Sequence, residues 1–100
     1  MYFITCFQKY EKDKNGWREI GASRTVGYYC NKGDATNAVI HNYADIYEYT
    51  YRYVVIEHIT EGLYNVASER LFFEWQEETQ EYTLIDGKPF EDCFGNYAFG

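Results

Sequence analysis

A single segment of this chain has the apolar spacing of an amphipathic helix, and this limits the folds it can adopt. In ATNAVIHNYADIYEY, residues 35–49, apolar side chains recur at positions 35, 38, 39, 43, 46 and 47. This is the spacing of one helix face, and the alanines favour it. Asp34 is the expected N-cap residue, and the helix is expected to run to about residue 48. No other segment has a convincing helical pattern.

The runs before this helix have the composition of strands. YFITCFQKY and WREIGASRTVGYYCN are rich in β-branched and aromatic residues, and the charged stretch between them ends in Asn15-Gly16. Asn-Gly is typical of a tight turn, so the two runs predict a β-hairpin. Gly21 and Gly27 indicate a bulge or a close backbone approach in the return strand.

The runs after the helix predict three more strands. YRYVVIEHIT is dense in β-branched and aromatic residues, and RLFFEWQEETQEYTLID has strand character on both sides of a polar centre, which predicts a second hairpin. EGLYNVASE is expected to be a loop, and the residues after Pro89 an irregular tail with at most a short last strand. The order ββαβββ predicts one α+β domain over residues 1–100, with an antiparallel sheet of about five strands and one helix packed on a face.

The charge of the chain is concentrated in its second half. The net charge is −7, and residues 1–50 hold six acidic and six basic side chains, whereas residues 51–100 hold ten acidic and three basic ones. A phosphate backbone attracts a basic surface, so this distribution argues against direct binding of nucleic acid. It favours a protein partner with a basic surface, including a surface built to bind nucleic acid.

Motifs for catalysis or metal binding are absent from the sequence. It contains no phosphate-binding glycine loop, zinc spacing or nucleophile motif, so we expect no enzyme activity, no cofactor and no metal site. Cys6, Cys30 and Cys93 are expected to be buried free thiols, because three widely spaced cysteines do not make a disulfide framework. The lack of a signal-peptide pattern and of a long apolar run predicts a cytoplasmic protein with no membrane partner.

The second hairpin is the first candidate binding site, because carboxylates surround its aromatic residues. If Leu71, Phe73 and Trp75 face the core, Phe72 points outward among glutamates, and an exposed aromatic ringed by charge is typical of an interface. The alternative is a solvated hairpin tip with no partner. The candidate partner-binding residues are Phe72, Glu74, Trp75, Glu77, Glu78 and Glu81.

A second candidate site combines an arginine with tyrosines. In SRTVGYY, strand alternation would place Arg24, Val26 and Tyr28 on one face. Arginine beside tyrosine is a frequent composition of contact sites, and arginine can also hold a phosphate. The candidate ligand-binding residues are Arg24, Tyr28, Tyr51 and Tyr53. A purely structural alternative remains open, in which Arg24 pairs with Asp45, Glu48 or Glu57.

The stretch YEYTYRY, residues 47–53, places tyrosine at every second position. Four rings would share a face only if the whole stretch were extended. Since the helix is expected to run to about residue 48, we expect these tyrosines to serve the junction between helix and strand rather than a ladder of rings.

Four motifs in this order resemble an uncharacterised family of small proteins from gut Firmicutes and their phages: SRTVGYY, YRYVVIEHITEGLY, RLFFEW and a terminal NYAFG. The family has no established activity, so the resemblance transfers no catalytic or binding residue. The resemblance implies a small stand-alone cytosolic protein of the kind that phages carry, and such proteins often act on host defence systems.

Two functions follow as hypotheses. The favoured one is a non-enzymatic binding protein, a phage or mobile-element inhibitor of a host defence system that docks on a basic protein surface through the acidic hairpin. The alternative is an oligomeric small-molecule binder that sequesters a nucleotide-type signal through the arginine–tyrosine site, which makes a homo-oligomer one of the expected states.

Overall fold

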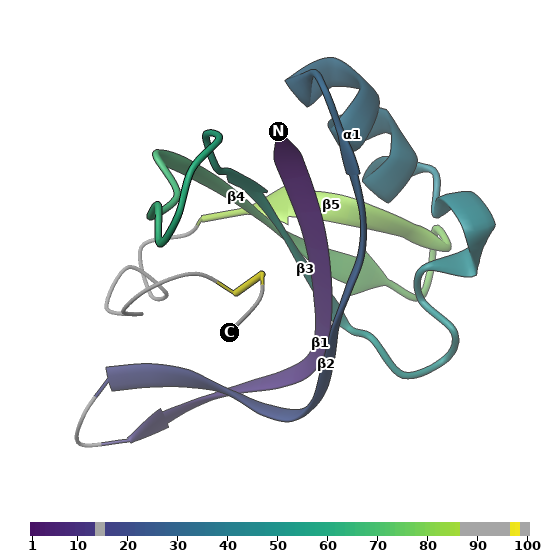
Figure 1. The fold of residues 1–100 in the computed structure, drawn as a ribbon. Helices are drawn as coiled ribbons and strands as arrows, with labels where there is room; N and C mark the ends of the chain where they lie inside the picture. Colours follow the sequence, from purple (N-terminus) through teal and green to yellow (C-terminus); the bar gives the residue numbers. More distant parts are fainter. Residues whose placement is uncertain (14–15, 87–96, 99–100) are drawn as a thin grey trace.

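The computed structural model describes residues 1–13, 16–86 and 97–98. Its strands are β1 (Tyr2–Asp13), β2 (Gly16–Tyr29), β3 (Tyr53–His58), β4 (Glu69–Gln76) and β5 (Glu81–Ile85), and its helices are α1 (Lys32–Ile40) and the short 3₁₀ turn η1 (Tyr43–Asp45) (Figure 1). The strands form one antiparallel sheet in the order β2-β1-β3-β4-β5. The predicted α+β fold and the order ββαβββ are confirmed for the described residues.

Both faces of the sheet are covered. The helix α1 and residues 97–98 lie on opposite sides of the central strands (Figure 1). On the α1 side, Ala35 and Val39 of the helix pack with Val54, Ile56 and Phe73 of the sheet. On the other side a smaller cluster forms, made of Phe7, Val55, Phe72 and Tyr97.

The central strand β3 is buried from both sides, which explains its composition. Val54, Val55, Ile56 and Glu57 are at most 1% exposed. Removing a Val or Ile side chain from water contributes roughly 1.5–3 kcal/mol, so a continuous β-branched run is what a strand buried on both faces requires.

The buried carboxylate of Glu57 ties residues 97–98 to the sheet. It accepts hydrogen bonds from the backbone N–H groups of Tyr97 at 3.0 Å and Ala98 at 2.7 Å. Arg70 on the neighbouring strand donates to the same carboxylate from Nε at 2.9 Å. A charge without these partners would be costly inside the protein, so this set of contacts acts as a clamp, called here the Glu57 clamp.

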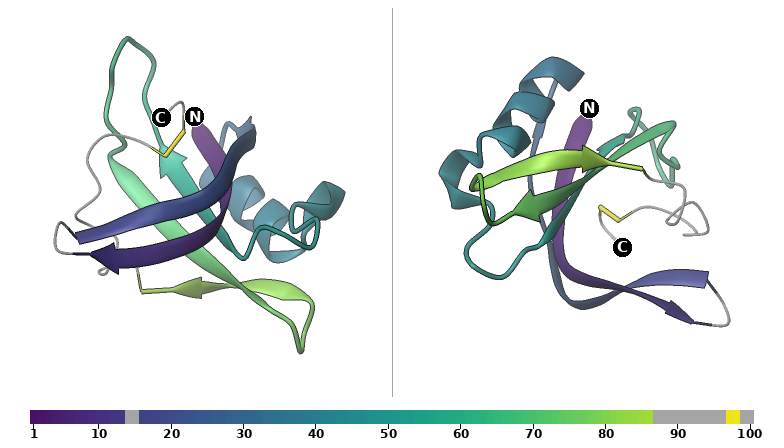
Figure 2. Two further views of the ribbon diagram at one scale, coloured as in Figure 1. Left: turned by 90° about the horizontal axis from the view of Figure 1, so that it is seen from below. Right: turned by 180° about the vertical axis from the view of Figure 1, so that it is seen from behind.

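The hairpin β1–β2 is longer than its contact with the rest of the sheet. Residues 2–7 of β1 pair with β3, whereas the distal half of the hairpin pairs within itself and bends away from the sheet (Figure 2). The register shifts between Ile4 and Thr5 and again between Phe7 and Lys9. Gly27 is opposite Ile4 at the first shift, and Gly21 lies between the residues opposite Phe7 and Lys9 at the second. The bulge predicted from the two glycines is therefore confirmed.

The helix is shorter than predicted, and its N-cap is a different residue. Asn31, not Asp34, is the N-cap: its side chain accepts a hydrogen bond from the backbone N–H of Asp34 at 2.8 Å. The helix ends at Ile40 rather than near residue 48. Asn42 has a left-handed φ of 51°, and its side-chain oxygen accepts from the N–H of Tyr47 at 2.9 Å. This local hydrogen bond replaces the helical one, which is how asparagine competes with a helix.

The remaining loop assignments also hold where the structure describes them. The second hairpin turns through residues 77–80, and residues 59–68 connect β3 to β4 without a helix or strand. Asn15, residues 87–96 with Cys93, and residues 99–100 lie outside the described residues, so the predicted tail is described only at Tyr97 and Ala98. No helix among the described residues is long and apolar enough to cross a membrane.

Candidate binding surface and pocket

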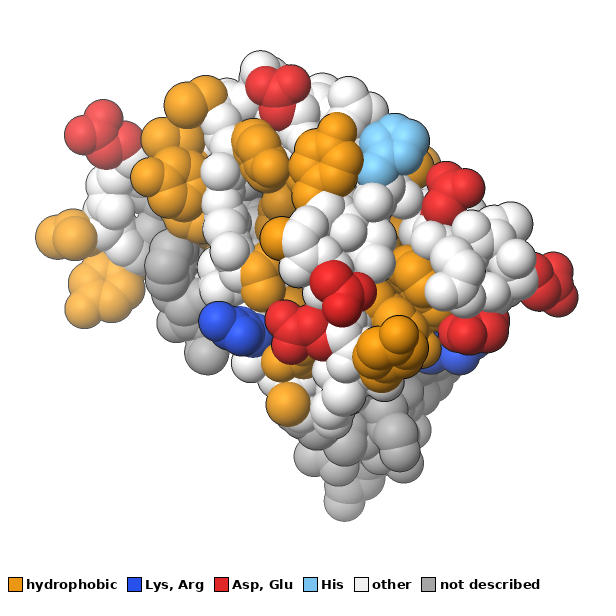
Figure 3. Space-filling model, turned by 90° about the vertical axis from the view of Figure 1, so that its right-hand side faces the viewer, with side chains coloured by type: hydrophobic (Ala, Val, Ile, Leu, Met, Phe, Trp, Pro, Cys, Tyr) orange, Lys and Arg blue, Asp and Glu red, His pale blue; other side chains and the backbone are white. Residues whose placement is uncertain are grey.

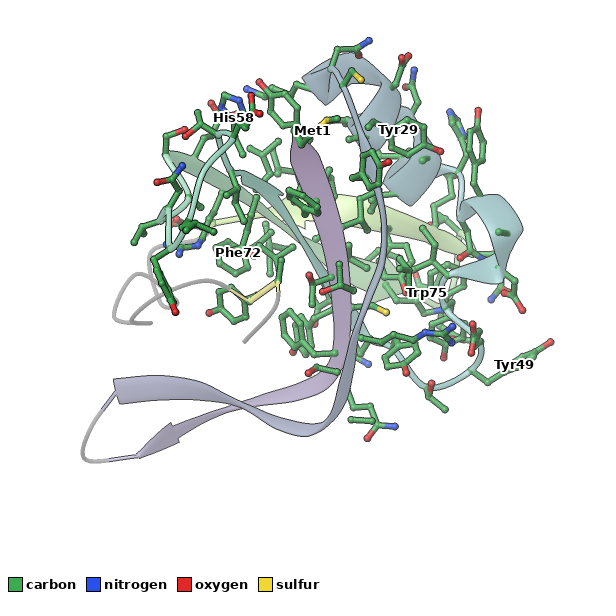
Figure 4. All side chains as sticks on the ribbon, in the orientation of Figure 1. Met1, Tyr29, Tyr49, His58, Phe72 and Trp75 are labelled. Carbon is green, nitrogen blue, oxygen red and sulfur yellow. The ribbon has the colours of Figure 1, made fainter. Side chains whose placement is uncertain are left out.

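The two aromatic residues of the predicted hairpin site are buried. Phe72 and Trp75 are each 4% exposed. Figure 4 labels both residues within the molecule. The ring of Tyr47 stacks on that of Trp75 with centroids 4.1 Å apart, and Phe72 packs edge-on against Tyr97. The prediction of an outward Phe72 is wrong because residues 97–98 cover the second face of the sheet. Neither aromatic residue can anchor a partner from this position.

The glutamates of the hairpin divide into engaged and exposed ones. Glu74 accepts from Arg52 Nε at 3.1 Å, and Glu77 accepts from Trp75 Nε1 at 2.9 Å. Glu78 and Glu81 are exposed. Their side chains make no ion pair or hydrogen bond with the part of the chain that the structure describes. Of the predicted acidic set, these two carboxylates remain available to a partner.

Tyr49 is an exposed aromatic residue beside this hairpin that the sequence did not single out. It is 87% exposed and projects away from the body of the molecule (Figure 4). Its ring centroid lies 5.8 Å from that of Tyr47, whose hydroxyl donates to Glu77 at 3.4 Å. Figure 3 shows hydrophobic side chains among acidic ones on this side of the molecule. Tyr49, Glu77, Glu78 and Glu81 are called here the acidic end.

The four tyrosines of residues 47–53 do not form a ladder. Tyr47 and Tyr51 pack against the core on the α1 side, Tyr53 packs against the opposite cluster, and Tyr49 is exposed. The stretch lies between η1 and β3, as the junction interpretation predicted. Glu48 and Tyr49 have φ values of 46° and 62°, which break the alternation of an extended strand.

The bulge in β2 separates the residues of the predicted arginine–tyrosine site. Arg24 is opposite Cys6, which faces α1, whereas Tyr28 is opposite Phe3 and its ring lies 5.7 Å from the Phe3 ring. Directly opposed residues share a face, so Arg24 and Tyr28 lie on different faces and the prediction of a common face is wrong. One extra residue, Val26, reverses the alternation. Tyr51 and Tyr53 do not join Arg24 either.

Arg24 nevertheless lines a pocket of about 320 Å³ between β2, α1 and the segment that follows α1. The strand contributes Arg24, Gly27 and Tyr29, and the segment after α1 contributes Tyr43, Ile46 and Glu48. Tyr28 also lines the pocket. No ion pair joins Arg24 to Asp45, Glu48 or Glu57, and Glu57 pairs with Arg70 instead.

The cysteines differ in their surroundings. Cys6 is buried and its thiol donates to the carbonyl of Arg24 at 3.2 Å. Burial raises the pKa of Cys6 to about 12, so the thiol is neutral and unreactive in the folded state. Cys30 is exposed, which contradicts the predicted burial. Among the described residues, no group of three or more His, Cys, Asp or Glu side chains converges as metal ligands would.

Comparison with known proteins identifies no relative: no family model, curated protein or solved structure matches the chain.

Proposed function

We propose that the protein binds a protein partner with a basic surface through its acidic end. The observation that carries the proposal is Tyr49, 87% exposed beside the exposed carboxylates of Glu78 and Glu81. Tyrosine is a frequent anchor of interfaces because it contributes a large contact area at low entropic cost. Tyr49 therefore takes the role that the sequence had assigned to Phe72 and Trp75.

The support beneath Tyr49 favours a preorganised surface. Tyr47 stacks on Trp75, and both donate hydrogen bonds to Glu77. This network joins the segment after α1 to the turn of the second hairpin. A surface already held in place loses less entropy when a partner binds. The left-handed φ values of Glu48 and Tyr49 are energetically unfavourable, and the contacts of this network stabilise them.

Charge supports the choice of a basic partner. The net charge is −7, and the unpaired carboxylates of the acidic end attract cations at long range. Binding through such charges weakens with salt. The resemblance described above extends the proposal to a non-enzymatic inhibitor whose target is a protein of a host defence system, with a basic surface built for nucleic acid.

A pair of matched double variants tests the acidic end. Tyr49→Ala with Glu78→Lys removes one tyrosine and reverses one charge at the acidic end. Tyr64→Ala with Glu61→Lys makes the same change on the loop before β4, where Tyr64 is 100% exposed. The two tyrosines also share a left-handed backbone conformation, with φ values of 62° for Tyr49 and 57° for Tyr64. Glu77 is left intact because its hydrogen bonds support the fold.

The readout is capture of partners from host lysate at low and high salt, followed by the affinity of the purified pair. We expect the Tyr49 variant to bind at least tenfold more weakly, while the Tyr64 variant binds like the wild type. A captured partner that both variants bind equally well would overturn the acidic end as the docking site.

A second candidate function, an oligomeric binder of a nucleotide-type small molecule, is supported by a different observation. The pocket beside α1 is lined by Arg24 together with Tyr29 and Tyr43. Converging polar and aromatic groups in a concave site are typical of ligand sites. Binding of a small ligand there would perturb the amides of Gly27 and Ala38, both of which line the pocket, in an NMR titration. Perturbation at other positions alone would count against this site.

A further inference from the structure

Gly27 keeps the pocket beside α1 open, although its backbone does not require a glycine. A Cβ added to Gly27 would meet no atom within 4 Å, and its φ is not left-handed. Gly27 is opposite Ile4, whose side chain faces the α1 core, so the missing side chain would project to that same side. A strand position with open space favours a β-branched residue over glycine. What glycine does at this position is to leave the space empty.

The opposite wall of the pocket is held in an unusual backbone conformation. Asn42, Ala44 and Glu48 have φ values between 46° and 54°, in the left-handed region that disfavours side chains. Asn42 holds this segment, because its Oδ1 accepts a hydrogen bond from the N–H of Tyr47 and its Nδ2 donates one to Asp45. Strained residues persist only where surrounding contacts over-determine them, and they cluster at ligand sites.

The lining specifies the kind of ligand. The buried residues Ile4, Ala38 and Ile46 provide an apolar bottom. Tyr29 and Tyr43 also line the pocket, and a tyrosine ring is a surface on which a planar group can stack. Apolar and aromatic surfaces of this kind favour a flat, weakly polar ring.

Two charged side chains define the polar part of the ligand. Arg24 carries a permanent positive charge and binds phosphate or carboxylate groups through paired N–H donors. Glu48 accepts hydrogen bonds, as acidic residues do from ribose hydroxyls in nucleotide sites. Glu48 and the net charge of −7 both repel further negative charge, so one phosphate is favoured over two or three.

We propose that this pocket binds a mononucleotide, with Arg24 on the phosphate, Tyr29 and Tyr43 on the base and Glu48 on the ribose. The proposal rests on the second candidate function, small-molecule binding, and names its ligand class. It is independent of the acidic end, because Tyr49, Glu78 and Glu81 do not line the pocket.

The test is an NMR titration of the full chain with adenosine monophosphate as the probe. Adenosine, inorganic phosphate, adenosine triphosphate and L-tryptophan are titrated in parallel. We expect saturable shifts of the Gly27, Ala38 and Ala44 amides with the monophosphate, and weaker binding of adenosine and of the triphosphate.

Three variants assign the contacts. Gly27→Val fills the pocket and is expected to abolish binding while the spectrum stays that of a folded protein. Arg24→Ala is expected to weaken monophosphate binding by at least tenfold, since a hydrogen bond to a charged group is worth that much. The matched control is Arg52→Ala, which removes an arginine that does not line the pocket and pairs with Glu74 instead, and this variant should bind normally.

The outcomes separate the two levels of the proposal. If adenosine or L-tryptophan binds as tightly as the monophosphate, or if Arg24→Ala binds normally, the mononucleotide assignment is overturned while small-molecule binding stands. If no probe shifts the pocket amides, both the ligand class and the second candidate function are overturned. An intact affinity in Gly27→Val would show that the bound probe lies elsewhere and would also overturn the assignment.

Discussion

The two faces of the sheet are closed by different kinds of interaction. On the α1 side, Val39, Ile56 and Phe73 meet through apolar contacts, which depend on volume rather than direction. On the other side a smaller apolar cluster is closed by the Glu57 clamp, in which a fully buried carboxylate accepts hydrogen bonds from backbone N–H groups. We therefore expect a conservative substitution on the α1 face to cause only a small loss of stability. The other face depends on all the hydrogen-bond donors to a single buried carboxylate.

The largest effect is expected from breaking the clamp. Glu57→Ala removes the buried carboxylate that accepts from Arg70 Nε and from two backbone N–H groups, and we expect a loss of about 3–5 kcal/mol in the free energy of unfolding. Urea denaturation followed by circular dichroism measures it. Glu57→Gln, which keeps the shape and one acceptor oxygen, should lose less. A loss below 1 kcal/mol in the alanine variant would show that the clamp does not close this face.

The stability of the α1 face should depend on pH in the alkaline range. The pKa of Cys6 is raised from 9.0 to about 12 by burial, so the folded protein keeps a proton that the unfolded chain releases above pH 9. The stability is complete below pH 9 and falls as pH rises from 9 towards 12, by up to about 1.4 kcal/mol per pH unit. Cys6→Ala should flatten this part of the curve, and the matched variant of the exposed Cys30 should not. Equal curves for both variants would contradict the assignment.

A conservative deletion on the α1 face should cost little in comparison with the clamp. Ile56→Val removes one methylene next to Glu57 in sequence but from the apolar face, and we expect a loss of about 0.5–1.5 kcal/mol. Urea denaturation of this variant beside Glu57→Gln compares the two faces directly at adjacent positions. If Ile56→Val proves the more costly, the distinction between the faces fails.

The smallest effect is expected where the same kind of ion pair lies at the surface. Arg52 pairs with Glu74, and the arginine side chain is 61% exposed, against 20% for Arg70 in the clamp. Arg52→Ala should cost less than about 1 kcal/mol, and the difference should shrink further in high salt. A loss comparable to that of Glu57→Ala would mean that burial does not set the strength of these pairs.

Local patterns predicted the elements correctly where neighbours in sequence decide the structure. β3 was recognisable because its β-branched run suits a strand buried on both faces, and the second hairpin because a polar turn separates two such runs. The helix was correct from Ala35 to Ile40 but wrong at both ends: its N-cap is Asn31 rather than Asp34, and after Ile40 Asn42 binds the backbone locally instead. In each case the deciding contact spans only a few residues.

The candidate sites were less accessible to sequence reasoning, since they depend on which face a side chain occupies. A bulge at Val26 moved Tyr28 to the face opposite Arg24. Tyr49 became prominent because the backbone after α1 takes left-handed conformations. Gly27 indicated a bulge in this strand but not the residue at which it occurs, and the residues beside Tyr49 do not indicate its left-handed backbone.

The sequence by itself determined the fold class, the order of the elements and the acidic character of the second half of the chain. These properties follow from composition and from periodicity over a few residues. The tertiary structure alone decided that Phe72 is buried and that Gly27 and Arg24 share a pocket with Glu48. The burial of Phe72 depends on Glu57 binding Tyr97 and Ala98, which lie 40 and 41 positions further along the chain. The pocket depends on where the segment after α1 folds back against β2. Contacts at such separations are set by packing of the whole chain, not by any local pattern.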